Sequence, residues 1–109
     1  MCKLLPMNTK ELTLKEMQDY IRAHYYQHDQ ERGTAGTFMW LIEEIGELST
    51  ALQNITADPS NPAFRQNLQE EFGDVLGWLS TLANMHGIDL GTAFRLKYMD
   101  KADPGAHKS

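Results

Sequence analysis

Two short acidic segments place carboxylates at a spacing that could hold a metal ion. "EEIGE" begins at residue 43 and "EEFGD" begins at residue 70. Residues three apart share one face of a helix, so Glu44 pairs with Glu47 and Glu71 pairs with Asp74. A bound cation would offset the repulsion between these like charges. Four carboxylates without sulfur or imidazole suit a hard cation, and we predict Mg²⁺, with Mn²⁺ as a possible substitute.

Two simpler explanations compete with a metal site. Each segment could form a solvated helix face, or its carboxylates could pair with basic residues of a partner. The metal site is favoured because the pattern occurs twice, beside apolar residues and with a glycine in each copy. Gly46 and Gly73 each cost about 1 kcal/mol relative to alanine inside a helix. We expect close helix packing or room for a ligand to offset that cost.

The elements that must position these carboxylates are predicted to be helices. Apolar residues recur at i, i+3, i+4 and i+7, and no segment shows convincing strand alternation. Four helices are expected, at about residues 13–30, 37–55, 62–85 and 90–101. Short connections make successive helices antiparallel. The predicted fold class is therefore all-α, a four-helix bundle-like protomer whose central antiparallel hairpin carries the acidic motifs.

Local signals mark the ends of these helices. Thr13 followed by Glu16 predicts a capping box at the first helix. Asn61 followed by Pro62 predicts the start of the third helix, and Gly87 suits the left-handed position after its end. The sequence "ERGTAGT" contains two glycines and predicts a loop between the first two helices.

Composition limits the class of protein. The length of 109 residues predicts one domain, 1–109, with a core at about 13–101 and a flexible tail at 102–109. A net charge of −5 argues weakly against nucleic acid or an anionic membrane as a partner. The single cysteine excludes an intrachain disulfide. A cytoplasmic location is expected, since neither a signal peptide nor a membrane span is recognisable.

The spacing of the acidic segments resembles the signature of the all-α nucleotide pyrophosphohydrolase superfamily. Here the pattern is Glu43-Glu44-x-x-Glu47, a spacer of 23 residues, and Glu71-x-x-Asp74. Over about residues 35–98 the wider sequence is similar to the MazG-like branch, in "FMWLIEEIGELSTALQN" and "LQEEFGDVLGWLSTLANMHGIDLGTAFRLKY". Other members of the superfamily are dimeric dUTPases, dCTP pyrophosphatases and phosphoribosyl-ATP pyrophosphohydrolases.

This resemblance implies an enzyme that hydrolyses a nucleoside or deoxynucleoside triphosphate to the monophosphate and pyrophosphate, as house-cleaning of the nucleotide pool. It implies that the Mg²⁺ ligands are Glu44, Glu47, Glu71 and Asp74. Glu43 lies one residue away from the ligand face, and we predict that it is the catalytic residue that activates water. The alternative for Glu43 is a solvent-facing acid.

Two cations near the end of the chain are candidate phosphate-binding residues. Members of the family commonly carry a lysine at the position of Lys97, and Arg95 lies two residues earlier. Many members continue with Asn and Arg, whereas this chain continues with "YMDKADPG". This difference from the family affects the part of the predicted site that would bind the phosphates.

Two tryptophans are candidates for the wall of a base-binding pocket. Trp40 is four residues before Glu44, and Trp78 is four residues after Asp74, so each shares a face with an acidic motif. A base can stack on an aromatic ring, although ordinary packing in a core or an interface is the favoured explanation for both residues.

The activity and the assembly leave alternatives open. The chain could be a non-catalytic helical interaction module that retains a metal site, or a phosphoribosyl-ATP pyrophosphohydrolase. Four short helices with a wide apolar stripe leave surface that one copy covers poorly, so a homodimer or homotetramer is expected. The expected partners are therefore a nucleotide substrate and further copies of the chain.

Overall fold

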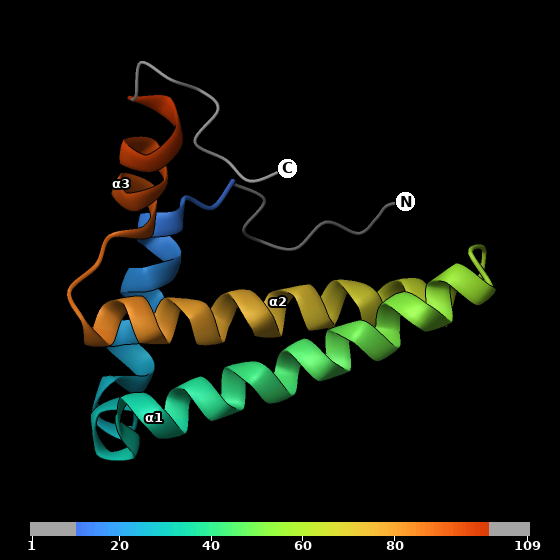
Figure 1. Ribbon diagram of the computed structural model, residues 1–109, viewed down its shortest axis with the longest axis horizontal. Helices are drawn as coiled ribbons and strands as arrows, with labels where there is room; N and C mark the ends of the chain where they lie inside the picture. The colour runs from blue at the N-terminus through green and yellow to red at the C-terminus, as the bar shows by residue number, and fades with distance from the viewer. Residues whose placement is uncertain (1–10, 101–109) are drawn as a thin grey trace.

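The protein is helical throughout the part that can be described. The structure is a computed structural model, and it describes residues 11–100. Its elements are α1 (Leu14–Ala57), α2 (Pro62–Met85), α3 (Leu90–Phe94) and a π-helical turn, η1 (Arg95–Met99) (Figure 1). Residues 11–100 contain no strand, which confirms the all-α class.

Helix α1 consists of two helical segments joined at Gly33. The first segment is residues 14–32 and the second is residues 34–57, because Gly33 alone has non-helical torsions, φ 82° and ψ 170°. The Thr13–Glu16 capping box predicted at its start is confirmed. The predicted loop at "ERGTAGT" is wrong. A single residue with positive φ turns the chain, and Thr37 Oγ1 stabilises the corner by donating to the Gly33 carbonyl at 2.7 Å.

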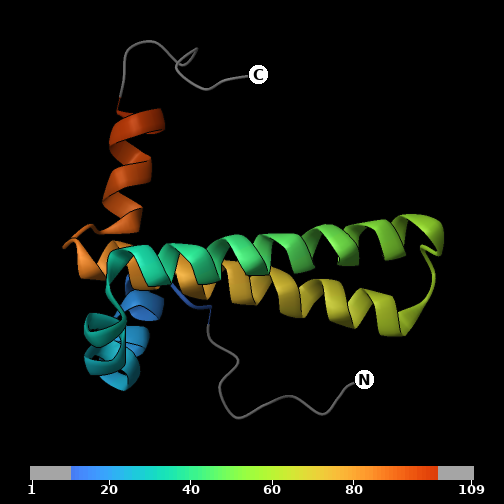
Figure 2. The same cartoon turned by 60° about the horizontal axis from the view of Figure 1, so that its bottom comes forward.

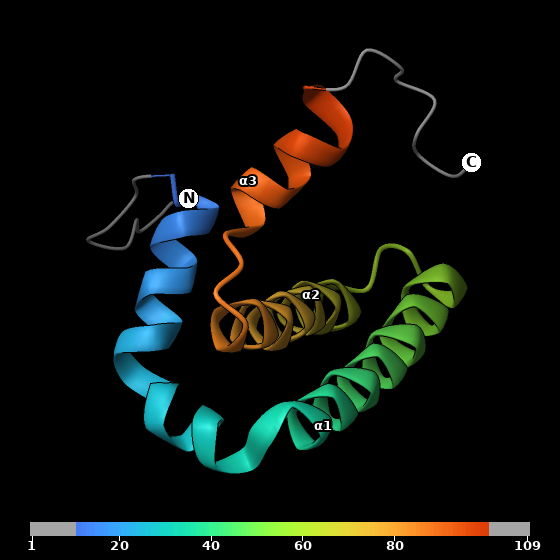
Figure 3. The ribbon, with the colours of Figure 1, turned by 60° about the vertical axis from the view of Figure 1, so that its left-hand side comes forward.

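The central hairpin has the predicted antiparallel arrangement. α2 begins at Pro62, where the Asn61 side chain accepts hydrogen bonds from the next backbone amides, and Gly87 has the expected positive φ of 67° after its end. The second segment of α1 and α2 lie side by side along their lengths (Figure 2). α2 also lies in the angle between the two segments of α1 (Figure 3). One helix therefore contacts both parts of α1.

The chain end forms an arm, defined here as α3 and η1. Asp89 caps α3 by accepting from the Thr92 amide. The expected fourth helix at 90–101 is present as a short α-helix followed by the π-helical turn, which ends at Met99. The arm stands away from the hairpin (Figure 3). The predicted tail at 102–109 lies outside the described residues.

A buried polar network fixes the first segment of α1 against the end of α2. The Gln18 amide donates to Asn84 Oδ1 at 3.1 Å and to the Ile88 carbonyl at 2.8 Å. Asn84 Nδ2 donates to the Gln18 carbonyl, and the Leu90 amide donates to Gln18 Oε1. Gln18 is only 4% exposed and Asn84 8% exposed. These bonds satisfy the buried amides and hold the turn that leads to the arm.

Burial of apolar side chains is far less complete. Within residues 11–100 the buried apolar residues are Leu41, Ala51, Leu68 and Ala83, whereas eighteen large apolar residues are exposed. The predicted stripe on the second segment of α1 is mainly exposed, at Phe38, Ile42, Ile45 and Leu52. The radius of gyration is 16.5 Å, against about 13 Å for a compact domain of this length. None of the described helices has the length and apolar character needed to cross a membrane.

Candidate functional site

Three carboxylates from the two hairpin helices converge. Glu44 and Glu47 lie one helical turn apart on α1, and Glu71 faces them from α2. One oxygen from each of the three lies within 4.8 Å of the others. The antiparallel packing of α2 against α1 brings these residues together although they are distant in sequence. This arrangement could place three oxygen ligands around a small cation.

Glu47 is exposed, and the strongest indication of a bound cation is the burial of Glu71 and of one oxygen of Glu44. Glu71 is 8% exposed, and Asn67 donates to its Oε2 at 3.3 Å. The other oxygen of Glu71, and Oε2 of Glu44, are buried without a hydrogen-bond partner among the described residues. A buried carboxylate oxygen without a partner is costly. A divalent cation would satisfy both oxygens, and the all-oxygen donor set fits Mg²⁺ or Mn²⁺.

The electrostatics of Glu44 agree with that geometry. Burial raises the pKa of Glu44 above its usual value, and the neighbouring charges of Glu47, Asp74 and Glu71 raise the pKa further. Both effects disfavour the ionised carboxylate. Binding of either a proton or a metal ion would therefore stabilise the cluster.

Asp74 and Glu43 occupy different positions from the three converging residues. Asp74 follows Glu71 by one turn and lies close enough to raise the pKa of Glu44, yet it is not within the 4.8 Å group. Its side chain lines a pocket beside the cluster. Glu43 is exposed, and its charge has the smallest of the named effects on Glu44. Of the four carboxylates proposed from the sequence as metal ligands, three thus converge and Asp74 lies at the edge of the group.

The pocket beside Asp74 has a volume of about 560 Å³ and lies between the first segment of α1 and α2. Its walls come from both helices: Ile21, Tyr25, His28, Asp29, Arg32, Gly73, Asp74, Gly77, Trp78 and Thr81. A Cβ atom added at Gly46, Gly73 or Gly77 would meet nothing within 4 Å. Of the two explanations expected for Gly46 and Gly73, this open space favours room for a ligand over close helix packing within the described residues.

An arginine that sequence reasoning missed lies at this pocket. Arg32 Nη1 donates to Asp29 Oδ1 at 3.2 Å and to Thr37 Oγ1 at 3.0 Å. Its guanidinium lies 4.8 Å from the centre of the Trp78 ring. Asp29 is only 4% exposed, so the ion pair is well shielded on the acid side. The i, i+3 spacing of Asp29 and Arg32 was the available signal.

The two tryptophans stack on each other. Their ring centroids are 5.9 Å apart and the ring planes differ by 10°. Trp78 lines the pocket, while Trp40 lies behind it on α1 and is 46% exposed. Trp78 is thus the tryptophan with access to a ligand in the pocket.

The predicted phosphate-binding residues lie on the arm. Lys97 and Arg95 are both exposed on η1, and Arg95 pairs with Asp100 at 3.5 Å. Because the arm stands away from the hairpin, the described structure does not bring either residue to the carboxylate cluster (Figure 3).

The comparison with protein families agrees with the geometry. The family model described as the MazG nucleotide pyrophosphohydrolase domain matches residues 32–104. The matched region contains both acidic segments and the arm, and omits most of the first segment of α1. A comparison with curated proteins finds no match. Since the family match covers more than half of the 109 residues, the chain belongs to the MazG nucleotide pyrophosphohydrolase family.

Proposed function

We propose that the protein hydrolyses a nucleoside or deoxynucleoside triphosphate to the monophosphate and pyrophosphate in a Mg²⁺-dependent reaction. Membership of the MazG family supports nucleotide pyrophosphohydrolase chemistry. The observation that carries the metal dependence is the pair of buried, unpartnered oxygens on Glu44 and Glu71. The cellular role that we propose is house-cleaning of the nucleotide pool.

In this proposal Glu44, Glu47 and Glu71 hold the metal ion, and Asp74 completes the site from its edge. A bound Mg²⁺ would neutralise phosphate charge and make a bound water more acidic. Glu43 is exposed and adjoins the ligands in sequence, so we assign it the removal of a proton from the attacking water. The neighbouring pocket receives the base, with Trp78 as one wall.

Lys97 and Arg95 are proposed to contact the phosphates. Because their arm stands away from the hairpin of the same chain, we expect a second copy to bring them to the site. Trp40, which lies behind Trp78, is assigned a supporting role in the base pocket.

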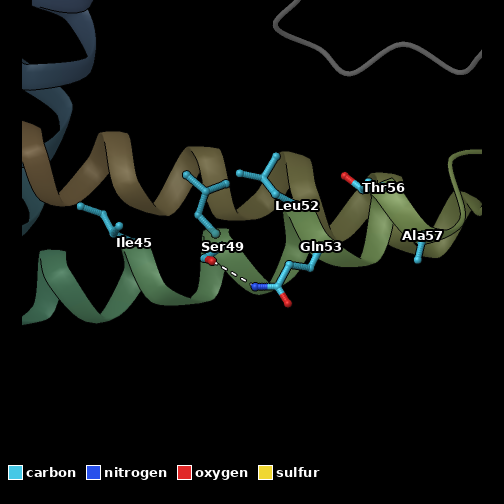
Figure 4. A pocket seen from close by; sticks show the side chains of 7 residues that line it. Ile45, Ser49, Leu52, Gln53, Thr56 and Ala57 are labelled. Carbon is cyan, nitrogen blue, oxygen red and sulfur yellow. Dashed lines mark hydrogen bonds between the residues drawn. The ribbon is translucent and has the colours of Figure 1, made fainter.

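We further propose a homodimer or homotetramer. A groove of about 560 Å³ runs along the second segment of α1, and apolar Ile45 and Leu52 line it together with polar Ser49 and Gln53 (Figure 4). The neighbouring α2 exposes Phe72, Leu76 and Leu79. Exposed apolar area of this extent typically marks a protein interface. A second copy, which would present the same apolar residues, is the proposed occupant.

The test is release of pyrophosphate from a panel of ribonucleoside and deoxynucleoside triphosphates, with phosphoribosyl-ATP included. We expect Mg²⁺-dependent release that is lost in Glu44→Ala and Asp74→Ala. Absence of release from every substrate would contradict the enzymatic proposal and favour a binding module. Release that both variants retain would contradict the assignment of the site.

A further inference from the structure

We propose that the pocket beside Asp74 seats the substrate base on bare backbone at Gly73 and Gly77, and that Arg32 selects bases with a carbonyl edge. Guanine, uracil and thymine would then be preferred over adenine. The proposal rests on the proposed function for the identity of the ligand as a nucleotide. It adds a seat and a specificity-determining residue that the acidic motifs do not contain.

The seat follows from two glycines one turn apart. Gly73 and Gly77 are at i and i+4 on α2, so they share a face, and that face lines the pocket. Each glycine costs about 1 kcal/mol relative to alanine within a helix. Since no neighbouring atom lies within 4 Å of a Cβ at either position, packing inside the chain does not require glycine there. An open strip of backbone of this kind gives a flat group space to approach the helix.

The walls suit a flat ring with polar edges. Ile21 and Tyr25 are one turn apart on the first segment of α1, and Trp78 faces the pocket from α2. Apolar and aromatic side chains pack against the flat faces of a base. Specificity then comes from polar groups that form hydrogen bonds with the edge of the base. Asp74 belongs both to this pocket and to the surroundings of Glu44, so a base here would direct its phosphates toward the carboxylates.

Arg32 supplies the donors for that edge. Its hydrogen bonds within the described residues are both made through Nη1, to Asp29 and Thr37, which leaves Nη2 and Nε for a ligand. The Trp78 ring at 4.8 Å also restrains the guanidinium plane. Arginine has donors and no acceptor, so it favours ring carbonyls over an amino group. Asp29 is a positioning residue, because it acts through Arg32.

Tryptophan fluorescence offers a direct test that requires no turnover. The chain has two tryptophans, and both lie in the stack at this pocket. The full-length protein is titrated with dGMP, dUMP and dAMP in EDTA. We expect saturable quenching, with the dissociation constants of dGMP and dUMP about 5- to 150-fold below that of dAMP, the range for discrimination by a good arginine contact. Absence of saturable quenching by all three would overturn the proposal.

Variants at Gly77 separate binding from folding. Gly77→Ala and Gly77→Leu both raise helix propensity, so the melting temperature should stay the same or increase. We expect Gly77→Leu to abolish quenching by dGMP and Gly77→Ala to weaken it. Quenching by Gly77→Leu equal to that of the unmodified chain would overturn the seat.

Variants at Arg32 test selection. Arg32→Met keeps a long side chain against Trp78 and removes the donors, so the preference for dGMP over dAMP should disappear. Because this change leaves buried Asp29 without its partner, the double variant Asp29→Asn with Arg32→Met is the comparison that removes both charges. A retained preference in the folded double variant would overturn the role of Arg32.

Pyrophosphate release measured in parallel distinguishes the two proposals. Nucleotide binding without pyrophosphate release contradicts only the proposed function. Release that is unaffected by the Gly77 and Arg32 variants contradicts only this inference.

Discussion

The junction of the first segment of α1 with the end of α2 is built differently from the hairpin. At this junction the two helices meet through buried, hydrogen-bonded side chains, centred on Gln18 and Asn84. Along the hairpin, the helices pack on few buried residues and expose large apolar ones such as Ile45 and Phe72. A single chain therefore determines the geometry of the junction, whereas the hairpin requires additional contacts. The carboxylate cluster lies on the hairpin, and the pocket lies between α2 and the first segment of α1.

The largest effect is expected from breaking the junction between the first segment of α1 and the end of α2. Gln18→Leu would leave Asn84 Oδ1, the Ile88 carbonyl and the Leu90 amide without their present partners. The buried Asn84 acceptor costs about 1–3 kcal/mol without a partner, and the two less buried groups add to this cost, so the free energy of unfolding should fall by about 3 kcal/mol. Urea denaturation measures this change. Gln66→Leu is the matched control, because exposed Gln66 makes one bond to Glu70 and should change stability little.

The next effect tests the hairpin. Leu52→Asp places a charge in the apolar groove of α1, where a second copy is proposed to pack. A charge buried without a partner is strongly unfavourable, so self-association should weaken at least about 100-fold. Light scattering coupled to gel filtration measures the mass. Leu52→Met should keep the assembly. An unchanged mass in Leu52→Asp would show that this groove is not the interface.

A smaller effect concerns pH at the cluster. The pKa of Glu44 is raised in the folded state, so between the unfolded and folded pKa values the folded chain binds more protons. Metal-free protein should therefore lose stability as pH rises through that window, and Mg²⁺ should restore stability at the higher pH. Thermal denaturation from pH 4 to 8 measures both. Glu44→Gln should show a flatter pH profile and a weaker response to Mg²⁺, and an unchanged profile would contradict the role of Glu44.

The smallest effect is expected at Gly46, an exposed glycine of the hairpin. A Cβ at Gly46 meets nothing within 4 Å in the single chain, so Gly46→Ala should stabilise the isolated helix by up to about 1 kcal/mol. If a second copy packs closely on this face, the same change should instead weaken the assembly. Melting temperatures at two protein concentrations separate these outcomes.

Much of the fold could be predicted because local chemistry determines it. The caps at Thr13 and Asn61 follow from side chains that reach amides within three residues, and both were confirmed. The corner could not be predicted in this way. Two glycines in seven residues suggested a loop, but a single positive φ at Gly33 and the hydrogen bonds of Thr37 let helix resume at once.

The candidate site was predictable where spacing along one helix was sufficient. The pairing of Glu44 with Glu47, and the approach of Glu71, follow from helix periodicity and an antiparallel hairpin. The place of Asp74 at the edge, and the contact of Arg32 with Trp78, depend on the angle between α2 and the first segment of α1. No periodicity encodes that angle.

The corner at Gly33 also lets the first segment of α1 act as a lever, because a small rotation at Gly33 moves the far end of the segment by a large distance. At about 1.5 Å per residue, the segment extends about 28 Å from the pivot. A change of about 10° in one torsion at Gly33 would displace its far end by about 5 Å, by the same geometry. Tyr25 and His28 lie along this lever and form one wall of the pocket, while α2 holds the other. The width of the pocket therefore depends on two backbone torsions at a residue that does not line the pocket, together with the Gln18–Asn84 hydrogen bonds that hold the far end of the segment against α2.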